Sequence, residues 1–272
     1  MDAGRAFFAL SPERKAAVRR TEREPLGHYD AEHVRNVRDW KEVFDMFPRE
    51  LPAAADGELV FRNKWPDGDL PEFRKALEEY AVAMEELAFK LLELIARSLN
   101  LRPGRLHGFF REQTTYTRIN RYPPCPRPDL VLGLGRHKDS GALAILCQDD
   151  VGGLDVRRPS DGEWVRVKPV AGSFIVNVGD IIQVWSNDTY ESVEHRTSVN
   201  SETERFSIPY FFNPGMDTLI EPLQEMVTDD NPSRYNGFSW GEFFSTRRKS
   251  NFRKLSVENI QITHFRKDGL VV

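Results

Sequence analysis

From residue 114 onward the apolar residues recur with a period of two, and this pattern most limits what the chain can fold into. Eight short strand-like segments follow one another, separated by Gly, Pro, Asp and Asn, over residues 114–122, 142–148, 154–157, 164–168, 173–178, 181–185, 193–199 and 205–213. Many short strands with turn signals between them are typical of an antiparallel double-sheet jelly roll. The sequence therefore predicts a double-stranded β-helix at the centre of the fold.

Helical signals flank this region on both sides. Residues 71–99 carry apolar residues at spacings of three and four, namely Phe73, Leu77, Tyr80, Met84, Leu87, Leu91 and Leu94. That spacing predicts one long helix whose apolar stripe packs on the outside of a sheet. Shorter helices are expected after Ser11 and from Trp240 toward Lys249. The predicted fold class is mainly β with flanking helices, a jelly-roll core and a long supporting helix.

Composition limits the domain organisation and the partners. The chain has 272 residues, 40% of them hydrophobic, which is enough for one sizeable core. We divide it into a helical N-terminal portion at 1–112, a jelly-roll core at 113–215, and a C-terminal helical extension and tail at 216–272. The net charge of −4, with acids and bases mixed, gives no sign of binding to nucleic acid or to a membrane surface.

The cysteine content bears on the compartment. Two cysteines, Cys125 and Cys147, do not make a disulfide framework, and no apolar run is long enough to span a bilayer. We therefore expect a cytoplasmic protein, and a monomer.

Two histidines and one aspartate form the clearest candidate site. His137 and Asp139 are two residues apart, and His195 lies in a later strand-like segment. In an extended strand, residues two apart point the same way, so His137 and Asp139 are expected to face one metal while Lys138 faces elsewhere. Two imidazoles and one carboxylate are the set that holds a non-haem Fe(II) on one face and leaves positions open.

A candidate carboxylate clamp follows ten residues beyond His195. Arg205 and Ser207 share one face of the last strand by the same period of two, and a guanidinium beside a hydroxyl suits a carboxylate. If residues 200–204 close a hairpin, His195 and Arg205 become neighbours across two antiparallel strands. A metal beside a carboxylate clamp suits a 2-oxo acid, chelated to the metal at one end and docked on Arg205 and Ser207 at the other.

Two predicted strands are expected to line the same cavity. One face of the last strand carries Arg205, Ser207, Pro209, Phe211 and Asn213, and one face of the first carries Tyr116, Arg118, Asn120 and Tyr122. The opposite face of the last strand, with Phe206, Ile208, Tyr210 and Phe212, is expected to pack outward beneath helices. We take Tyr116, Arg118, Phe211 and Asn213 as candidate substrate-lining residues.

At this point the chain resembles a known family, the plant 2-oxoglutarate- and Fe(II)-dependent dioxygenases of the flavonoid, gibberellin and ethylene-forming oxidase type. The resemblance rests on six short motifs in order, His137-x-Asp139, His195, Arg205-x-Ser207, Asn120-x-Tyr122-Pro123, Val151-Gly152-Gly153-Leu154 and Asn177-Val178-Gly179-Asp180. It implies that His137, Asp139 and His195 bind Fe(II). It also implies that Arg205 and Ser207, together with Tyr122 and Asn120, bind the cosubstrate 2-oxoglutarate.

The resemblance implies an activity as well. An enzyme of this type uses O2, with ascorbate to keep the iron reduced, and converts 2-oxoglutarate to succinate and CO2 while it hydroxylates or desaturates a small organic substrate. For this chain that substrate is expected to be a plant metabolite or hormone with an aromatic or terpenoid skeleton. Family members use a C-terminal helix like the one expected near Trp240 to close the substrate pocket.

Two alternative functions belong to other classes. In the family a substantial segment precedes the position where this chain begins, close to Phe7-Phe8-Ala9-Leu10. A shortened N-terminus favours a catalytically impaired jelly roll that serves as a metal- or ligand-binding module. A cupin-like isomerase or storage protein would account for the candidate metal ligands but leaves Arg205 and Ser207 unused.

Overall fold

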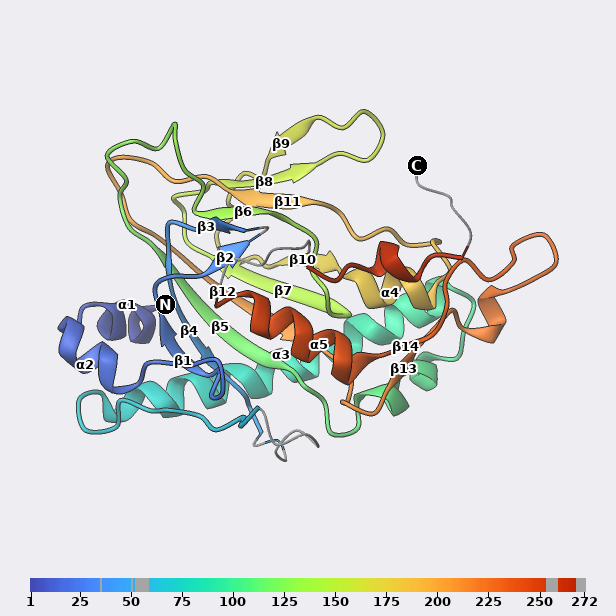
Figure 1. The fold of residues 1–272 in the computed structure, drawn as a ribbon, viewed down its shortest axis with the longest axis horizontal. Helices are drawn as coiled ribbons and strands as arrows, with labels where there is room; N and C mark the ends of the chain where they lie inside the picture. The colour runs from blue at the N-terminus through green and yellow to red at the C-terminus, as the bar shows by residue number, and fades with distance from the viewer. Residues whose placement is uncertain (35, 50, 52–58, 253–258, 268–272) are drawn as a thin grey trace.

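The computed structural model describes residues 1–272 except 35, 50, 52–58, 253–258 and 268–272 (Figure 1). Its α-helices are α1 (Asp2–Phe8), α2 (Pro12–Ala17), α3 (Pro71–Ser98), α4 (Asp180–Trp185) and α5 (Trp240–Ser250). Its 3-10 helices are η1 (Pro103–Phe110), η2 (Gln224–Met226) and η3 (Ile262–Phe265). Its strands are β1 (Gly27–Tyr29), β2 (His33–Val34), β3 (Val37–Arg38), β4 (Glu42–Met46), β5 (Tyr116–Tyr122), β6 (Leu134–His137), β7 (Leu143–Gln148), β8 (Leu154–Arg157), β9 (Trp164–Arg166), β10 (Ile175–Val178), β11 (His195–Thr197), β12 (Arg205–Phe212), β13 (Leu219–Ile220) and β14 (Phe238–Ser239).

Two antiparallel sheets form the centre of the molecule. The larger has the strand order β1-β4-β5-β12-β7-β10, and the smaller has the order β6-β11-β8-β9. In Figure 1 the smaller sheet lies on one side of the larger sheet and α3 runs along the other. This arrangement confirms the predicted jelly-roll core with a long supporting helix.

The long helix α3 covers the outer face of the larger sheet. The Tyr80 hydroxyl donates a hydrogen bond of 3.1 Å to the carbonyl of Ile208 in β12. The helix buries Phe73, Leu77, Ala81, Met84, Ala88, Leu92, Ile95 and Ala96. Leu94, which the sequence placed in the apolar stripe, is 62% exposed. The predicted stripe repeats every 3.5 residues, whereas a straight helix has 3.6 residues per turn, so the buried positions move ahead by one residue to Ala88, Leu92 and Ile95.

The two faces of strand β12 have different surroundings, as expected from the sequence. Phe206, Ile208, Tyr210 and Phe212 are all buried. The ring of Phe212 stacks on Phe110 of η1 with their centroids 4.0 Å apart, so this face packs against the helical layer. The opposite face, from Arg205 to Asn213, lines a cavity between the two sheets.

The predicted strand at 181–185 is wrong, because residues Asp180–Trp185 form the helix α4. All six residues of α4 are buried, including the polar Asp180 and Gln183, so the segment has no solvent-facing side that would show a helical period. A short, mostly apolar segment of this kind does not distinguish a buried strand from a buried helix. Three strands of the two main sheets were not predicted. Strand β1 lies in a polar segment, β4 in a segment predicted only to be amphipathic, and β6 just before the candidate metal ligands. The short strands β2, β3, β13 and β14 were not predicted either.

The first 112 residues contribute to the sheet as well as to the helical layer. Strands β1 and β4 extend the larger sheet, with β4 paired to β5. The domain boundaries at 112 and 215 stay predictions. Residues 253–258 and 268–272 of the expected C-terminal extension lie outside the described part.

The helix expected from Trp240 toward Lys249 is α5. No helix in the described residues is long and apolar enough to cross a membrane.

Glu42 joins three elements and should make the fold sensitive to acid. Its carboxylate contacts Lys15 at 2.6 Å, His28 at 3.1 Å and Arg121 at 2.7 Å. Burial alone would raise the pKa of Glu42, but hydrogen bonds from His28 and Lys15 outweigh it and lower the pKa to about 2. A carboxyl with a lowered pKa stabilises the fold above its unfolded pKa of 4.5, and this contribution is lost as pH falls toward about 2.

We therefore expect Glu42→Gln to be destabilising at neutral pH and progressively less so, relative to the natural protein, as pH falls below 4.5. Urea unfolding of both proteins from neutral pH to about pH 3 measures the difference. Glu78→Gln is the control, because Glu78 forms only a surface pair with Arg74. A difference for Glu42→Gln that does not change with pH would contradict the expectation.

Candidate active site

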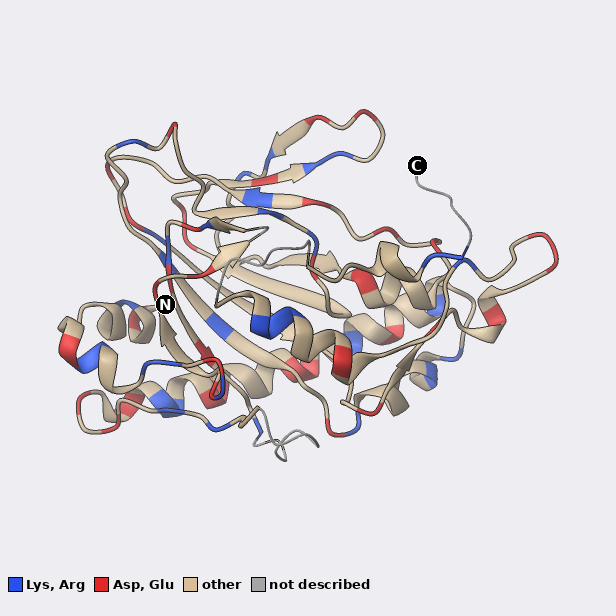
Figure 2. Cartoon of the chain, viewed as in Figure 1, with Lys and Arg blue, Asp and Glu red and all other residues tan. Residues whose placement is uncertain are grey.

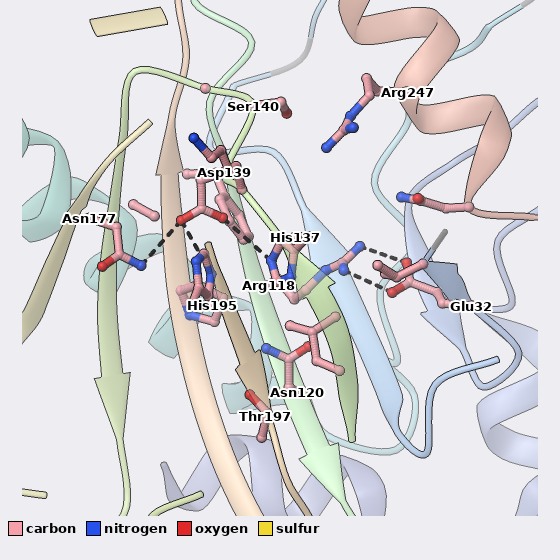
Figure 3. Close-up of a pocket in the computed structure, with 18 of the residues that line it drawn as sticks. Glu32, Arg118, Asn120, His137, Asp139, Ser140, Asn177, His195, Thr197 and Arg247 are labelled. Carbon is pink, nitrogen blue, oxygen red and sulfur yellow. Dashed lines mark hydrogen bonds and ion pairs between the residues drawn. The ribbon is translucent and has the colours of Figure 1, made fainter. Parts of the chain in front are cut away.

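A cavity of about 510 Å³ lies between the two sheets (Figure 3). Strands β5, β7 and β12 of the larger sheet and β6, β8 and β11 of the smaller one contribute to its wall, and α5 lies across one side. Every residue that the sequence proposed for the site lines it, namely Tyr116, Arg118, Asn120, Tyr122, His137, Asp139, His195, Arg205, Ser207, Phe211 and Asn213. The cavity therefore brings the candidate metal ligands and the candidate clamp into one space.

The candidate metal ligands converge within this cavity. One ligand atom from each of His137, Asp139 and His195 lies within 4.8 Å of the other two. The Nε2 atoms of the two histidines are 3.8 and 3.7 Å from the two carboxylate oxygens of Asp139. The imidazole centroids are 4.3 Å apart, so the three side chains surround one point.

The state of the two imidazoles fits metal binding. His137 Nδ1 lies 2.8 Å from the carbonyl of Gly135, and His195 Nδ1 lies 3.2 Å from the carbonyl of Val193. A carbonyl accepts hydrogen bonds only, so each Nδ1 carries a proton, and Nε2 is the ring nitrogen that each histidine offers to the cavity. Burial, with the neighbouring His195, holds the pKa of His137 well below its usual value, which keeps this imidazole neutral. Neutral imidazoles beside a carboxylate suit a divalent cation.

Asp139 is positioned by a loop rather than by a strand. Strand β6 ends at His137, so the expected extension through Asp139 is not observed. The backbone N–H of Asp180, at the start of α4, donates to the carbonyl of Asp139 at 2.8 Å and fixes the loop. A Cβ atom at Gly179 would lie 2.2 Å from the Gly141 carbonyl oxygen, so this approach requires glycine.

Asn177 orients the Asp139 carboxylate. Its side-chain amide donates to Asp139 Oδ2 at 3.3 Å from strand β10 (Figure 3). Partners of this kind hold a metal-binding carboxylate in its orientation. From the sequence, Asn177 was assigned to the motif Asn177-Val178-Gly179-Asp180, and no role was predicted for it.

The candidate clamp lies on the larger sheet. Arg205 pairs in register with Tyr122, and its guanidinium lies 5.0 Å from the centre of the Tyr122 ring. One guanidinium nitrogen donates to Gln148 Oε1 at 2.8 Å, and the other lies 3.4 Å from Ser207 Oγ. The Asn120 amide also donates to Ser207 Oγ, at 3.3 Å. These contacts hold a cationic fork and a hydroxyl together at the cavity wall.

The expected hairpin between His195 and Arg205 is wrong. Strand β11 pairs with β6 and β8, whereas β12 pairs with β5 and β7. Residues 198–204 therefore cross from the smaller sheet to the larger, and the two side chains belong to opposite walls of the cavity. Turn residues occur both in hairpins and in segments that cross between sheets. The sequence pattern therefore does not distinguish these two connections.

Two buried polar atoms at the clamp have no hydrogen-bond partner among the described residues. They are Arg205 Nε and Asn120 Oδ1. An unpaired buried polar atom costs about 1–3 kcal/mol, so natural structures keep such atoms for a ligand or an internal water. A buried guanidinium with unused donor capacity suits a bound carboxylate. The residues present thus fit both a divalent metal and an acidic cosubstrate.

The expected substrate-lining residues differ in how they are used. The rings of Tyr116 and Phe211 stack with centroids 4.7 Å apart and form an aromatic wall. Arg118 instead donates to both Glu32 and Asp45, so its guanidinium is held by buried carboxylates. The Asn213 amide donates to the carbonyl of Thr114 at 3.2 Å.

Three residues of the site were missed or given no role. Gln148 and Asn177 each end or interrupt an apolar strand with one polar residue, and this signal could have marked them as facing something polar. Arg247 in α5 also lines the cavity, although no residue of the expected helix was predicted to face the site.

A jelly roll with a His-Asp-His triad and an arginine on the facing sheet defines the class of protein, a metal-dependent oxygenase of the 2-oxo-acid type.

Comparison with known proteins agrees with this class. Residues 114–214 match the 2OG-Fe(II) oxygenase superfamily. The chain is 36% identical over 261 residues to "Protein DMR6-LIKE OXYGENASE 2" of Arabidopsis thaliana, covering 90% of this chain and 69% of that protein. It is 42% identical over 208 residues to "Jasmonate-induced oxygenase 2" of Arabidopsis thaliana, covering 75% and 54% respectively.

A solved structure agrees over most of the chain. The crystal structure of JOX2 in complex with 2OG, Fe and JA superposes with a TM-score of 0.80 at 34% identity, covering 93% of this chain and 74% of that one. The chain thus belongs to the 2OG-Fe(II) oxygenase superfamily, whose members are dioxygenases that use Fe(II) and 2-oxoglutarate. It spans between about half and seven tenths of the length of the curated relatives named here.

Proposed function

We propose that this chain is a 2-oxoglutarate- and Fe(II)-dependent dioxygenase that oxidises a small organic molecule. The observation that carries the proposal is the convergence of His137, Asp139 and His195 in the same cavity as Arg205 and Ser207. Neither set alone is specific, because a metal triad occurs in other jelly rolls and a buried arginine occurs in many folds. Together they match the two ends of a metal-chelating dicarboxylate.

In this proposal the residues have separate roles. His137, Asp139 and His195 hold the Fe(II), and Asn177 keeps the Asp139 carboxylate turned toward it. Arg205 and Ser207 bind the far carboxylate of 2-oxoglutarate, with Tyr122 and Asn120 beside them. Gln148 holds the Arg205 guanidinium in place through its side-chain carbonyl.

The bound groups supply the oxidation: 2-oxoglutarate is decarboxylated to succinate and CO2 as O2 is consumed and the organic substrate is hydroxylated or desaturated. The chain contributes binding, orientation and exclusion of water. The aromatic wall of Tyr116 and Phe211 provides an apolar surface for the substrate.

The finer features of the proposal rest on residue chemistry. The aromatic wall supports a substrate with an aromatic or terpenoid skeleton, such as a plant metabolite or hormone. Cys125 and Cys147 are both free thiols, which supports action in a reducing compartment such as the cytoplasm. We propose that the chain acts there as a monomer, with ascorbate keeping its iron reduced.

The test is an anaerobic titration of Fe(II) and 2-oxoglutarate into the purified chain, followed by the visible charge-transfer band of the chelate. We expect the natural protein to give the band and His195→Ala to lose it. Arg205→Ala should weaken 2-oxoglutarate binding by roughly tenfold or more, because a hydrogen bond between charged groups contributes about 1.5–3 kcal/mol.

Matched controls are available in the same chain. His264→Ala and Arg97→Ala remove an exposed histidine and an exposed arginine, and both should keep the band. Absence of the band from folded natural protein would refute the proposal. The binding-module alternative is not favoured, since the chain belongs to an oxygenase family and both residue sets are present. The cupin-like alternative gives no role to Arg205 and Ser207.

A further inference from the structure

A group of buried charged side chains lies behind the cavity wall where β5 faces α5. Figure 2 shows charged residues of these two elements side by side. The members of this buried group are the cations Arg20, Lys41, Arg118 and Arg248 and the carboxylates Glu32, Asp39 and Asp45, and none of these side chains is more than 9% exposed. One of the carboxylates, Asp39, reaches the strand that carries a proposed metal ligand.

The segment between β3 and β4 holds strand β6 at its edge. Asp39 Oδ1 accepts a hydrogen bond of 2.9 Å from the backbone N–H of Gly135. The backbone N–H of Trp40 donates to the carbonyl of Leu132 at 3.0 Å. A Cβ atom at Gly135 would lie 3.2 Å from Val34 Cγ1 and 3.5 Å from Asp39 Oδ1, so the segment packs closely on this strand.

Strand β6 depends on this support because its own pairing is irregular. It stands at one end of the sheet order β6-β11-β8-β9, so within the described sheets it pairs with β11 alone. Two residue pairs mark a shift in register, His137 with His195 and Leu134 with Thr197. Two residues of β6 therefore stand where β11 has one. An irregularity of this kind disrupts the ladder locally, and here it falls at Gly135.

Gly135 in turn orients His137. Its carbonyl accepts from His137 Nδ1 at 2.8 Å, so the position of Gly135 sets the direction in which the imidazole presents Nε2. His195, by contrast, lies in β11, which is paired on both sides, to β6 and to β8. The two imidazoles are thus supported differently, and the orientation of His137 depends on Gly135.

The buried group fixes Asp39 itself. Asp39 Oδ2 accepts from Lys41 Nζ at 2.8 Å, and the same Nζ lies 2.9 Å from a carboxylate oxygen of Glu32. Arg118 donates to both oxygens of Glu32 at 2.9 Å (Figure 3). A carboxylate held through one oxygen by a buried cation keeps its other oxygen aimed at one donor. Asp39 is not among the described residues that line the cavity, so it acts on the site through Gly135.

We propose that Asp39 is a positioning residue for the metal site. Its carboxylate holds β6 at Gly135 and thereby keeps the His137 imidazole aimed at the point that it shares with the other two ligands. This inference rests on the proposed function in taking the triad as the metal site. It makes metal affinity depend on a residue that is distant from the triad in sequence and outside the cavity.

The first test is an anaerobic titration of Co(II) into the metal-free protein, followed by the visible absorption bands of the bound ion. Co(II) reports on the triad without 2-oxoglutarate and without oxygen chemistry. We expect Asp39→Ala to bind Co(II) about tenfold more weakly than the natural protein does. This is the lower end of the effect of an outer partner, about 10–100-fold, because Asp39 acts through one intervening residue.

A matched control separates positioning from stability. Asp45→Asn removes a carboxylate charge from the same buried group, but Asp45 contacts guanidinium groups of that group instead of β6. This variant should lose at least as much stability as Asp39→Ala and keep the Co(II) affinity of the natural protein. Glu42→Gln, a milder change in β4, takes its place if Asp45→Asn yields too little folded protein.

Two double variants isolate the hydrogen bond from the charge. Both carry Lys41→Met, and one adds Asp39→Asn while the other adds Asp39→Leu. Asparagine and leucine are similar in size and uncharged, and only asparagine offers an acceptor to the Gly135 N–H. We expect the variant with Asp39→Asn to bind Co(II) at least about fivefold more tightly than the variant with Asp39→Leu. If Asp39→Ala folds poorly, this pair decides, because both members lose one cation together with one carboxylate.

A second measurement needs no metal. In the metal-free protein, the Gly135 amide should exchange with solvent at least about tenfold faster in Asp39→Ala, because a hydrogen bond to a charged acceptor contributes about 1.5–3 kcal/mol. In Asp45→Asn the exchange rate at Gly135 should rise no more than the rates of the amides in β12.

Three results would overturn the inference. One is a Co(II) affinity of Asp39→Ala within about twofold of the natural value. Another is an equal loss of affinity in Asp45→Asn, which would make the effect one of stability. The third is equal affinity in the two double variants. The dioxygenase proposal has its own test, because absence of the chelate band with 2-oxoglutarate would refute it even if every Co(II) result were as expected.

Discussion

Replacing Asp139 with alanine should lower both Fe(II) affinity and 2-oxoglutarate turnover by at least about a hundredfold. The reason is that Asp139 is the anionic member of the triad and lies between the two imidazoles, 3.8 Å from one and 3.7 Å from the other. Losing an outer partner of a metal ligand costs about 10–100-fold, and losing the ligand itself costs more. Asn177→Ala should therefore fall between the natural protein and Asp139→Ala.

The measurement is succinate formation at increasing Fe(II), which separates metal affinity from the rate at saturation. Asp129→Ala is the matched control, because Asp129 pairs with Arg127 on an exposed loop away from the cavity. Equal turnover by Asp139→Ala and by the control at saturating iron would show that the triad does not hold the catalytic metal.

Replacing Asp45 with asparagine should be the most destabilising of the single changes considered. Asp45 is fully buried and accepts from Arg20, Arg118 and Arg248. Burial alone would raise the pKa of Asp45, but the surrounding guanidinium groups, Arg118 foremost, lower it, so the carboxylate is charged. Removing one partner of a buried ionic group leaves uncompensated charge and costs about 3–5 kcal/mol.

Urea unfolding of Asp45→Asn at neutral pH measures this loss of unfolding free energy. Glu78→Gln, which removes one carboxylate from a surface pair on α3, should cost no more than about 0.5 kcal/mol. If both variants lose the same small amount, the buried group does not contribute to stability as its geometry indicates.

The sequence predicted the parts of the fold that have a clear period. Strand β12 has a polar residue on one face and an apolar one on the other through Arg205, Phe206, Ser207 and Ile208, so its cavity wall and its buried face were both predicted correctly. The long helix α3 was predicted to within one residue because its apolar residues recur at helical spacing. These patterns are local, and each records which face of one element is buried.

The features that could not be predicted from the sequence depend on contacts between segments that are distant along the chain. The helix α4 is buried at all six positions, the polar Asp180 and Gln183 included, so nothing local distinguished it from a strand. Arg118 looked like a cavity residue, yet its carboxylate partners Glu32 and Asp45 are distant in sequence by 86 and 73 residues. Charged residues usually lie at the surface, so a buried ionic group assembled from several segments leaves no pattern in any one of them.

The proposed iron and cosubstrate residues stand on different sheets. His137 and His195 belong to the smaller sheet, and Arg205 and Ser207 belong to the larger one. The span that a bound oxo acid must bridge is therefore set by how far apart the two layers pack, and no single strand fixes it. Leu146 from the larger sheet and Leu154 from the smaller one both line the cavity between these layers. The packing between the two sheets therefore sets the distance from the proposed metal ligands to the proposed clamp.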